Sequence, residues 1–233
     1  MITIKKMIDA KVHFGHQTRF WNPKMSKFIF GHKNKIHIIN LEKTLYLYNK
    51  AINFVKKLSK NKKTILFVCT KRQARKIIFK EALKSKSPYI NQRWLGGTLT
   101  NFKTIKVSID HLIKLENTFK NFNEIKKKEI LLYNRKKNKL KKNFEGLKKM
   151  KFLPDALFII DIGYHKNAVI EAKKLNIPII ALVDTNHNPD NIDYIIPGND
   201  DSIKSIKLFS KGITNAILEG KALNIKNNLK FKF

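Results

Sequence analysis

The sequence predicts an α/β fold in which a doubly wound, mainly parallel sheet carries an inserted antiparallel helical hairpin. Short apolar runs alternate with amphipathic helical patterns on either side of a central segment. Such continuous runs are typical of parallel strands that are buried on both faces. Residues 102–150, by contrast, show only helical periodicity, which interrupts the sheet and indicates the hairpin.

Five apolar runs are predicted to form the sheet, because they are rich in β-branched and aromatic residues and lie between turn signals. The expected strands are Thr64–Cys69, Pro88–Asn91, Ala156–Asp161, Pro178–Val183 and Tyr194–Ile196. The helices that cover them are expected at Arg72–Lys84, Asn167–Leu175 and Ser202–Glu219. A sheet built in this order is of the flavodoxin-like or Rossmann-like kind.

Two helical patterns form the predicted coiled-coil hairpin. Their apolar positions are Ile105, Ile109, Leu112 and Ile113 in the first and Leu140, Phe144 and Leu147 in the second. The Asn-rich segment Asn117–Asn123 lies between them and is expected to form the turn. The chain then divides into an α/β domain (1–101 and 151–225, with an N-terminal arm at 1–40), the inserted hairpin (102–150) and a basic tail (226–233).

The charge of the chain predicts a polyanionic partner. It contains 49 Lys and Arg but only 17 Asp and Glu, a net charge of +32, while 42% of its residues are hydrophobic. Self-repulsion destabilises a folded chain of this charge, and nucleic acid rewards dense Lys and Arg by releasing counterions. The excess lies in residues 1–150, with 38 basic and 8 acidic residues, whereas residues 151–201 hold 4 basic and 8 acidic. Lys far outnumbers Arg, which also suggests a reduced, AT-rich genome as the source.

Cysteine usage and hydropathy indicate a reducing compartment. The single cysteine, Cys69, excludes an internal disulfide and lies on a predicted buried strand, so we interpret it as a core residue. The longest apolar runs are five residues, too short for a membrane span. We therefore expect a soluble, cytoplasmic protein with no membrane partner.

The sequence has no glycine-rich phosphate loop. The segment after the first strong strand, Cys69–Gln73, contains no glycine, although backbone amides need glycine to approach a phosphate so closely. This argues against a nucleotide-dependent enzyme. The histidines at 13, 16, 32 and 37 lack a Cys or carboxylate partner at close spacing, so we interpret them as packing or RNA-contacting residues.

A group of aspartates near predicted strand ends leaves two interpretations open. Asp184, Asp200 and Asp201, with Asp190 and Asp193 nearby, could hold a structural Mg²⁺ at the edge where such sheets bind ligands. They would then support an alternative function, a Mg-dependent enzyme acting on phosphate esters. The same residues are also strong turn formers and helix caps. We expect no cofactor apart from this candidate metal site.

Several blocks of the sequence carry a family resemblance. The longest are Val12–Met25, Asn34–Thr44 and Arg93–Asn101, and shorter ones follow at Leu153–Leu157, Ile177–Pro178, Val183–Asn186 and Ile196–Asp201. In this order they resemble the bacterial-type family of small-subunit ribosomal protein two, over Met7 to Gly220. The chain departs from the family at Cys69, where glycine is usual, at Lys151-Phe152, where a glycine pair is usual, and in its short basic tail.

The resemblance implies a structural, non-enzymatic component of the small ribosomal subunit. Its implied partners are small-subunit ribosomal RNA and neighbouring proteins of that subunit, including the messenger-binding protein one, with no homo-oligomer. The ribosome would be that of a bacterial cytoplasm or of an organellar stroma or matrix. The expected RNA contacts are His16, Arg19, Trp21, Lys24, Lys27, Lys33, Lys35, Lys71, Arg72, Arg93, Trp94 and Asn101. The two tryptophans can stack on bases or anchor their loops on the core, and both interpretations stay open.

Overall fold

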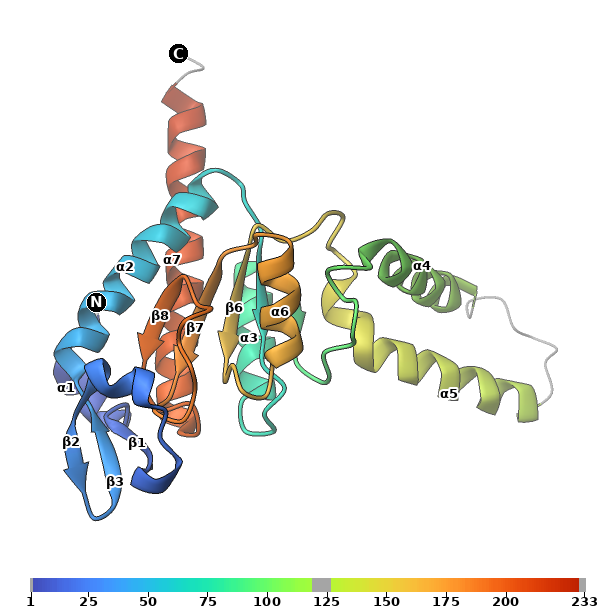
Figure 1. Cartoon of the computed structure of the whole chain (residues 1–233). Coiled ribbons are helices and arrows are strands. Elements are labelled where there is room, and N and C mark those ends of the chain that lie inside the picture. Colours follow the sequence, from blue (N-terminus) through green and yellow to red (C-terminus); the bar gives the residue numbers. More distant parts are fainter. Residues whose placement is uncertain (1, 119–126, 231–233) are drawn as a thin grey trace.

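A five-stranded parallel sheet forms the centre of the protein (Figure 1). The computed structural model describes residues 2–118 and 127–230. The strands follow the spatial order β5–β4–β6–β7–β8, and each neighbouring pair is parallel. Their bounds are β4 Ile65–Val68, β5 Tyr89–Ile90, β6 Ala156–Ile160, β7 Ile179–Val183 and β8 Tyr194–Pro197. The predicted fold class and all five predicted strands are confirmed, with strand ends that differ by one residue or less.

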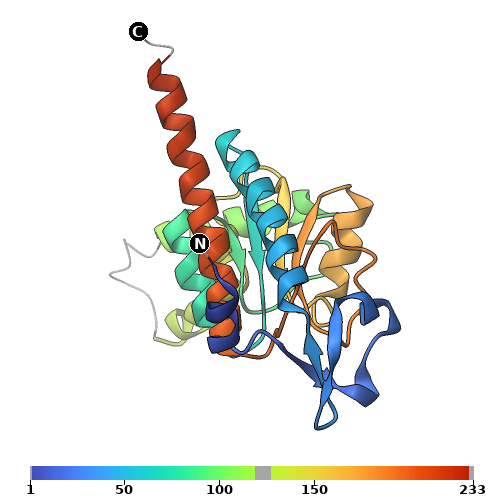
Figure 2. The ribbon, with the colours of Figure 1, turned by 90° about the vertical axis from the view of Figure 1, so that its left-hand side faces the viewer.

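Helices cover both faces of this sheet, which makes the fold doubly wound (Figure 1, Figure 2). Helices α2, α3 and α7 pack on one face, and α6 packs on the other beside the base of an inserted helical pair. In β4, Ile65 and Phe67 face the first layer while Leu66 and Val68 face the second, and all four are buried. Burial on both faces explains why the strands are continuously apolar. The helices span α2 Leu41–Lys60, α3 Arg75–Ser85, α6 Lys166–Lys174 and α7 Ile203–Lys230.

The N-terminal arm contains structure that the sequence analysis does not predict. After α1 it forms a three-stranded antiparallel sheet in the order β1–β3–β2. Asn34 and Lys35 connect β2 to β3 with φ angles of 50° and 61°, the left-handed conformation that a two-residue hairpin turn requires. The turn therefore places Lys33 and Lys35 at the tip of the arm. The elements are α1 Ile4–Asp9, β1 Phe14–Gln17, β2 Ile29–Lys33 and β3 Ile36–Ile39, with 3-10 helices η1 Thr18–Phe20 and η2 Pro23–Phe28.

Two of the predicted helices differ from their expected extents by more than one residue, and α2 was not predicted. Helix α3 begins at Arg75 rather than Arg72 because residues 71–74 first form a turn closed by hydrogen bonds to the Lys71 carbonyl. Helix α7 continues to Lys230 instead of ending at Glu219, since no proline follows to stop it. Residues 226–230 of the predicted tail thus continue this helix, and residues 231–233 lie outside the described residues. None of the helices described is both long and apolar enough to cross a membrane.

The inserted segment forms two neighbouring helices, α4 and α5, that extend away from the sheet (Figure 1). Ile109 and Leu112 on α4 and Phe144 on α5 are buried at the base, and the Lys148 ammonium lies 2.6 Å from Glu116. Coiled-coil packing of this pair stays a prediction, and residues 119–123 of the expected turn lie outside the described residues. The bounds are α4 Phe102–Thr118, α5 Lys127–Phe144 and the 3-10 helix η4 Glu145–Leu147.

Gly146 fixes the base of the hairpin against the edge of the sheet. A β-carbon at this position would lie 2.0 Å from the Tyr89 carbonyl oxygen and 2.7 Å from its ring. Because a backbone atom cannot move aside cheaply, we expect Gly146→Ala to lower the free energy of unfolding by about 1–3 kcal/mol. Urea unfolding measures the change, with Gly31→Ala as the control because no atom lies within 4 Å of an added β-carbon there. Equal losses for the two variants would contradict the expectation.

Candidate nucleic-acid interface

Lys71 lies at the carboxyl ends of the parallel strands and is surrounded by carboxylates. Its Nζ lies 2.7 Å from Asp161, 2.8 Å from Asp200 and 2.8 Å from Asp201. The Lys71 side chain is only 13% exposed, and Asp161 and Asp200 are buried. These residues meet because β4, β6 and β8 end at the same edge of the sheet. Asp161 directly follows β6, and the other charged groups lie in the short loops after β4 and β8.

Burial and pairing shift the pKa values of this strand-end cluster. Burial opposes the charge of Lys71, but the carboxylates of Asp200 and Asp161 outweigh it and raise the pKa of the ammonium. Burial also opposes the charge of Asp161, yet hydrogen bonds from His187 and Lys71 lower its pKa. Burial, together with the charges of Asp184 and Asp161, raises the pKa of Asp200 to about 7. Lys71 is therefore a cation paired within the protein, and the RNA contact expected for it stays a prediction.

His16 joins the N-terminal arm to the same cluster. Its Nδ1 lies 3.2 Å from Asp184 and its Nε2 lies 3.4 Å from Asp201. Its backbone N–H donates to the Thr185 hydroxyl at 2.9 Å. The hydrogen bond with Asp184 raises the pKa of His16, although burial acts in the opposite direction. The half-buried imidazole thus holds β1 against the end of β7, a structural position that differs from the RNA contact expected for His16.

Two groups of side chains in the strand-end cluster could hold a metal ion. They are His16, Asp184 and Asp200, and Asp161, His187 and Asp200, with one ligand atom of each residue within 4.8 Å of the others. The Oδ2 atom of Asp200 is buried and has no hydrogen-bond partner among the described residues. An ion would compete with the Lys71 ammonium for the same carboxylates. Of the candidate metal residues, Asp184 and Asp200 come together here, whereas Asp201 pairs with Lys71 and His16.

Three polar groups at this edge of the sheet are not activated as nucleophiles for the alternative phosphoester enzyme. Lys71 is held as a cation, and burial raises the pKa of the Cys69 thiol to about 12. Burial lowers the pKa of His165, whose Nε2 accepts a hydrogen bond from the Thr70 backbone at 3.1 Å. Ion pairs and hydrogen bonds thus join most polar groups at this edge of the sheet, while Asp200 Oδ2 has no partner among the described residues.

Exposed cations on the N-terminal arm form the first part of the candidate interface. Lys33 and Lys35 are exposed at the tip of the β2–β3 turn. The Arg19 guanidinium lies 4.4 Å from the ring centre of Phe20, and the Lys27 ammonium lies 5.1 Å from the ring centre of Phe28. In both contacts the charged group lies over an aromatic ring, and both side chains remain exposed. Lys24, by contrast, forms an ion pair with Asp190.

Aromatic side chains lie among these cations. Trp21 is 40% exposed and rests against the His37 ring at a centroid distance of 5.3 Å. Phe20 and Phe30 are exposed as well. An aromatic face among cations suits stacking on an unpaired base. We call this set the arm surface, which comprises Arg19, Trp21, Lys27, Lys33 and Lys35.

Arg72 and Arg93 are both exposed and form the second part. Arg72 lies in the turn before α3, and Arg93 lies beside the helical pair. Arg93 lines a hollow of about 390 Å³ together with Lys139 and Lys142 of α5. These two lysines are not among the RNA contacts that the sequence predicts. Their spacing of three residues on one predicted helix places them on the same face, and this spacing could have identified them as a pair of neighbouring cations. We call this set the hairpin surface, which comprises Arg72, Arg93, Lys139 and Lys142.

Glu171 on α6 holds the loop that carries the remaining predicted contacts. Its carboxylate accepts hydrogen bonds from the Trp94 indole at 2.9 Å and from the backbone N–H groups of Gly97, Leu99 and Thr100 at 3.0, 2.8 and 3.2 Å. Burial would raise the pKa of Glu171, but these donors together lower it. Trp94 therefore anchors its loop, which is the second of the two interpretations that the sequence left open.

Asn101 lies at the start of α4 and is exposed. Its side-chain oxygen accepts a hydrogen bond from the Thr104 hydroxyl at 2.8 Å, so it has a local role at the first turn of the helix. Most of the expected RNA contacts thus separate into exposed residues on two surfaces and into residues that hold the strand-end cluster and the loop after β5 in place. Lys24, which pairs with Asp190, and Asn101, which bonds within the first turn of α4, belong to neither group.

A family comparison covers nearly the whole of this arrangement. A family model described as ribosomal protein S2 matches residues 7–220. The matched residues include most of the N-terminal arm, both sheets, the helical pair and the larger part of α7.

Proposed function

The chain belongs to the ribosomal protein S2 family, and we propose that it binds small-subunit ribosomal RNA through the arm surface and the hairpin surface. The family is one of structural, non-enzymatic proteins of the small ribosomal subunit. His16, Lys71 and Trp94 are left out of the proposed interface, because ion pairs or hydrogen bonds within the protein already hold their polar groups.

The pairing of the basic residues is the observation that carries this proposal. Within the described residues, no carboxylate forms an ion pair with the exposed cations Arg19, Lys27, Lys33, Lys35, Arg72 and Arg93, whereas Lys71 has three carboxylate partners. Unpaired exposed cations can contact phosphates without breaking an existing interaction. Such contacts supply affinity and fix the orientation of a protein on folded RNA, without reading its sequence.

The aromatic residues of the arm support a proposed protein neighbour as well. Phe30 is 79% exposed and Phe20 is 55% exposed, which favours a partner that covers them. We propose neighbouring proteins of the small subunit, including docking of the messenger-binding protein one. We also propose that the protein acts without a required cofactor and without forming a homo-oligomer, on the ribosome of a bacterial cytoplasm or of an organellar stroma or matrix.

Reversing one charge on each surface is expected to weaken RNA binding. Lys35→Glu/Arg93→Glu removes two phosphate contacts and adds two repulsions. Its affinity for small-subunit ribosomal RNA should fall at least about tenfold at about 0.15 M salt, and the slope of log affinity against log salt should shrink by about two. Filter binding over a series of salt concentrations measures both quantities, and the wild-type slope should be several units.

The matched control is Lys204→Glu/Lys207→Glu, which makes the same charge change at exposed positions of α7. We expect this variant to bind RNA nearly as well as the wild type and to enter small subunits normally. A salt-independent wild-type affinity, or equal losses in the two double variants, would contradict the proposed interface.

A further inference from the structure

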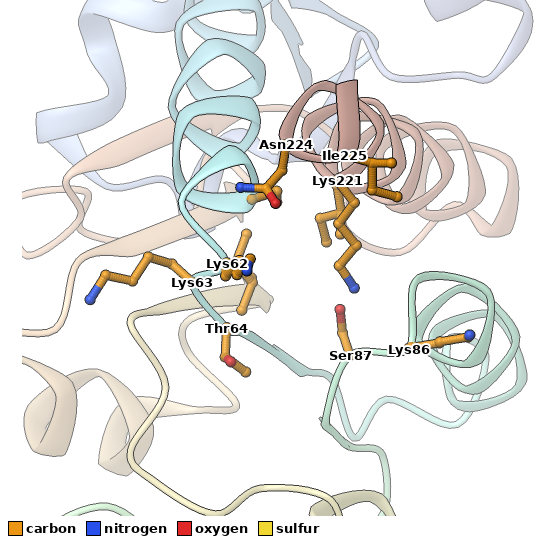
Figure 3. A pocket seen from close by; sticks show the side chains of 11 residues that line it. Lys62, Lys63, Thr64, Lys86, Ser87, Lys221, Asn224 and Ile225 are labelled. Carbon is orange, nitrogen blue, oxygen red and sulfur yellow. The ribbon is translucent and has the colours of Figure 1, made fainter. Parts of the chain in front are cut away.

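A basic hollow lies at the end of the sheet where β4 begins, opposite the strand-end cluster. Figure 3 shows the side chains that line it. It forms where α2 and α3 end, where β4 begins and where α7 passes the sheet. Its volume is about 340 Å³, within the range of small-molecule sites. It shares no residue with the arm surface or the hairpin surface.

Four lysines line the basic hollow. They are Lys62 and Lys63 after α2, Lys86 after α3, and Lys221 on α7. No acidic side chain lines the hollow within the part of the chain that the structure describes. Lys63 pairs with Asp155 at 2.9 Å and points away from the centre (Figure 3). The other three form no ion pair with any described residue, so the hollow has a surplus of positive charge.

Lys221 is the least exposed of the four lysines. Its side chain extends from α7 across the hollow toward Ser87 (Figure 3), and its ammonium donates to the Ser85 carbonyl at 2.6 Å. Burial and the nearby charge of Lys86 lower the pKa of Lys221. A bound anion would relieve both effects, because it would supply the missing negative charge.

Hydroxyl groups complete the lining. Ser59, Thr64 and Ser87 all border the hollow. The Ser59 hydroxyl is buried and has no hydrogen-bond partner among the described residues. Buried hydroxyls normally have a partner, so the protein leaves one polar group in the wall of the hollow unsatisfied.

We propose that the basic hollow binds a phosphate group, which Lys62 and Lys221 hold with help from the neighbouring hydroxyls. A phosphate offers several anionic acceptors to ammonium and hydroxyl donors. The phosphate belongs either to an RNA backbone or to a free polyphosphate such as a nucleoside triphosphate. The first of these sources rests on the proposed function. The competing account is that these lysines only offset the negative ends of the α2 and α3 dipoles.

Calorimetric titration of the full chain with tripolyphosphate tests the free-polyphosphate source. The wild type should bind it at about 0.15 M salt, and Lys62→Met/Lys221→Met should bind at least about tenfold more weakly. The matched control Lys204→Met/Lys207→Met removes the same charge from an exposed part of α7 and should keep the wild-type affinity. Equal affinities of the two variants would exclude the free-polyphosphate source, since binding would then follow net charge alone.

Affinity of the same variants for small-subunit ribosomal RNA tests the RNA source. A loss confined to Lys62→Met/Lys221→Met supports a site for the RNA backbone, and unchanged RNA affinity with lost tripolyphosphate binding supports a free polyphosphate. A loss in neither titration overturns the proposal and leaves only the dipole account. That outcome differs from failure of the proposed function, which Lys35→Glu/Arg93→Glu tests separately.

Amine labelling of the wild-type protein gives a measurement that does not depend on a variant folding. Tripolyphosphate or RNA should protect Lys62 and Lys221 several-fold more than Lys204 and Lys207, as read by mass spectrometry. Uniform protection of the four lysines would overturn the proposal.

Discussion

Replacing Lys71 with methionine is expected to lower the free energy of unfolding by about 3–5 kcal/mol at neutral pH, because it removes the cation from a buried group of carboxylates. The Lys71 ammonium lies within 2.8 Å of Asp161 and Asp200, which are 7% and 0% exposed. Methionine has nearly the same length and an apolar end, so the substitution tests charge more than packing. Urea unfolding followed by circular dichroism measures the loss.

The pH dependence of this loss gives a second signature. The pKa of Asp200 is about 7 even beside Lys71, and without the ammonium it should rise further. A carboxyl whose folded pKa exceeds its unfolded value destabilises the fold at high pH and takes up a proton as the pH falls. The penalty of Lys71→Met should therefore be smaller at about pH 5.5 than at about pH 8.

A matched control comes from the exposed member of the cluster. Asp201 is 55% exposed, so Asp201→Asn should cost about 1 kcal/mol or less. A loss of that small size for Lys71→Met, with no pH dependence, would contradict the structural role. If RNA affinity then fell while stability held, Lys71 would return to the list of phosphate contacts.

The sheet could be predicted from the sequence because its strands are buried on both faces. Phe67 and Leu66 point to opposite sides of β4 and both are fully buried, so the whole run must be apolar and stands out. Helix α2 also carries helical apolar periodicity, with Leu45, Tyr48, Ile52 and Val55 packed on the core. This pattern was available in the sequence, but α2 was not among the predicted helices.

The interface could be predicted only in part, since composition gives the sign of the charge but not the pairing. Lys33 and Lys71 look alike in the sequence, yet one is exposed at a turn and the other is enclosed by carboxylates. The partners of Lys71 lie far along the chain and meet it only because parallel strands end at one edge. Glu171 was missed for the same reason, because its hydrogen-bond donors belong to a loop that precedes it by more than seventy residues.

Removing the Glu171 carboxylate is expected to destabilise the protein and release the loop at residues 94–100. Glu171→Ala leaves the Trp94 indole and three backbone N–H groups without their acceptor. The N–H of Leu99 belongs to a residue that is 1% exposed, so water cannot easily replace the lost partner. We expect the free energy of unfolding to fall by about 2–4 kcal/mol, since each buried donor left unpaired costs about 1–3 kcal/mol.

Hydrogen exchange separates this effect from a general loss of stability. In Glu171→Ala the amides of Gly97, Leu99 and Thr100 should exchange faster than those of β6, because the loop opens locally while the sheet stays closed. The amide exchange rates of Glu171→Gln should fall between those of the wild type and Glu171→Ala, because its amide keeps one acceptor oxygen and turns an NH₂ group toward the remaining donors.

Glu219→Ala removes a 58% exposed carboxylate on α7 and is the control, with an expected cost of about 1 kcal/mol or less. Because Arg93 directly precedes this loop, Glu171→Ala should also weaken RNA binding at the hairpin surface while the arm surface keeps its contribution. Unchanged loop exchange in Glu171→Ala would show that the loop is held by its own packing, and Glu171 would lose its positioning role.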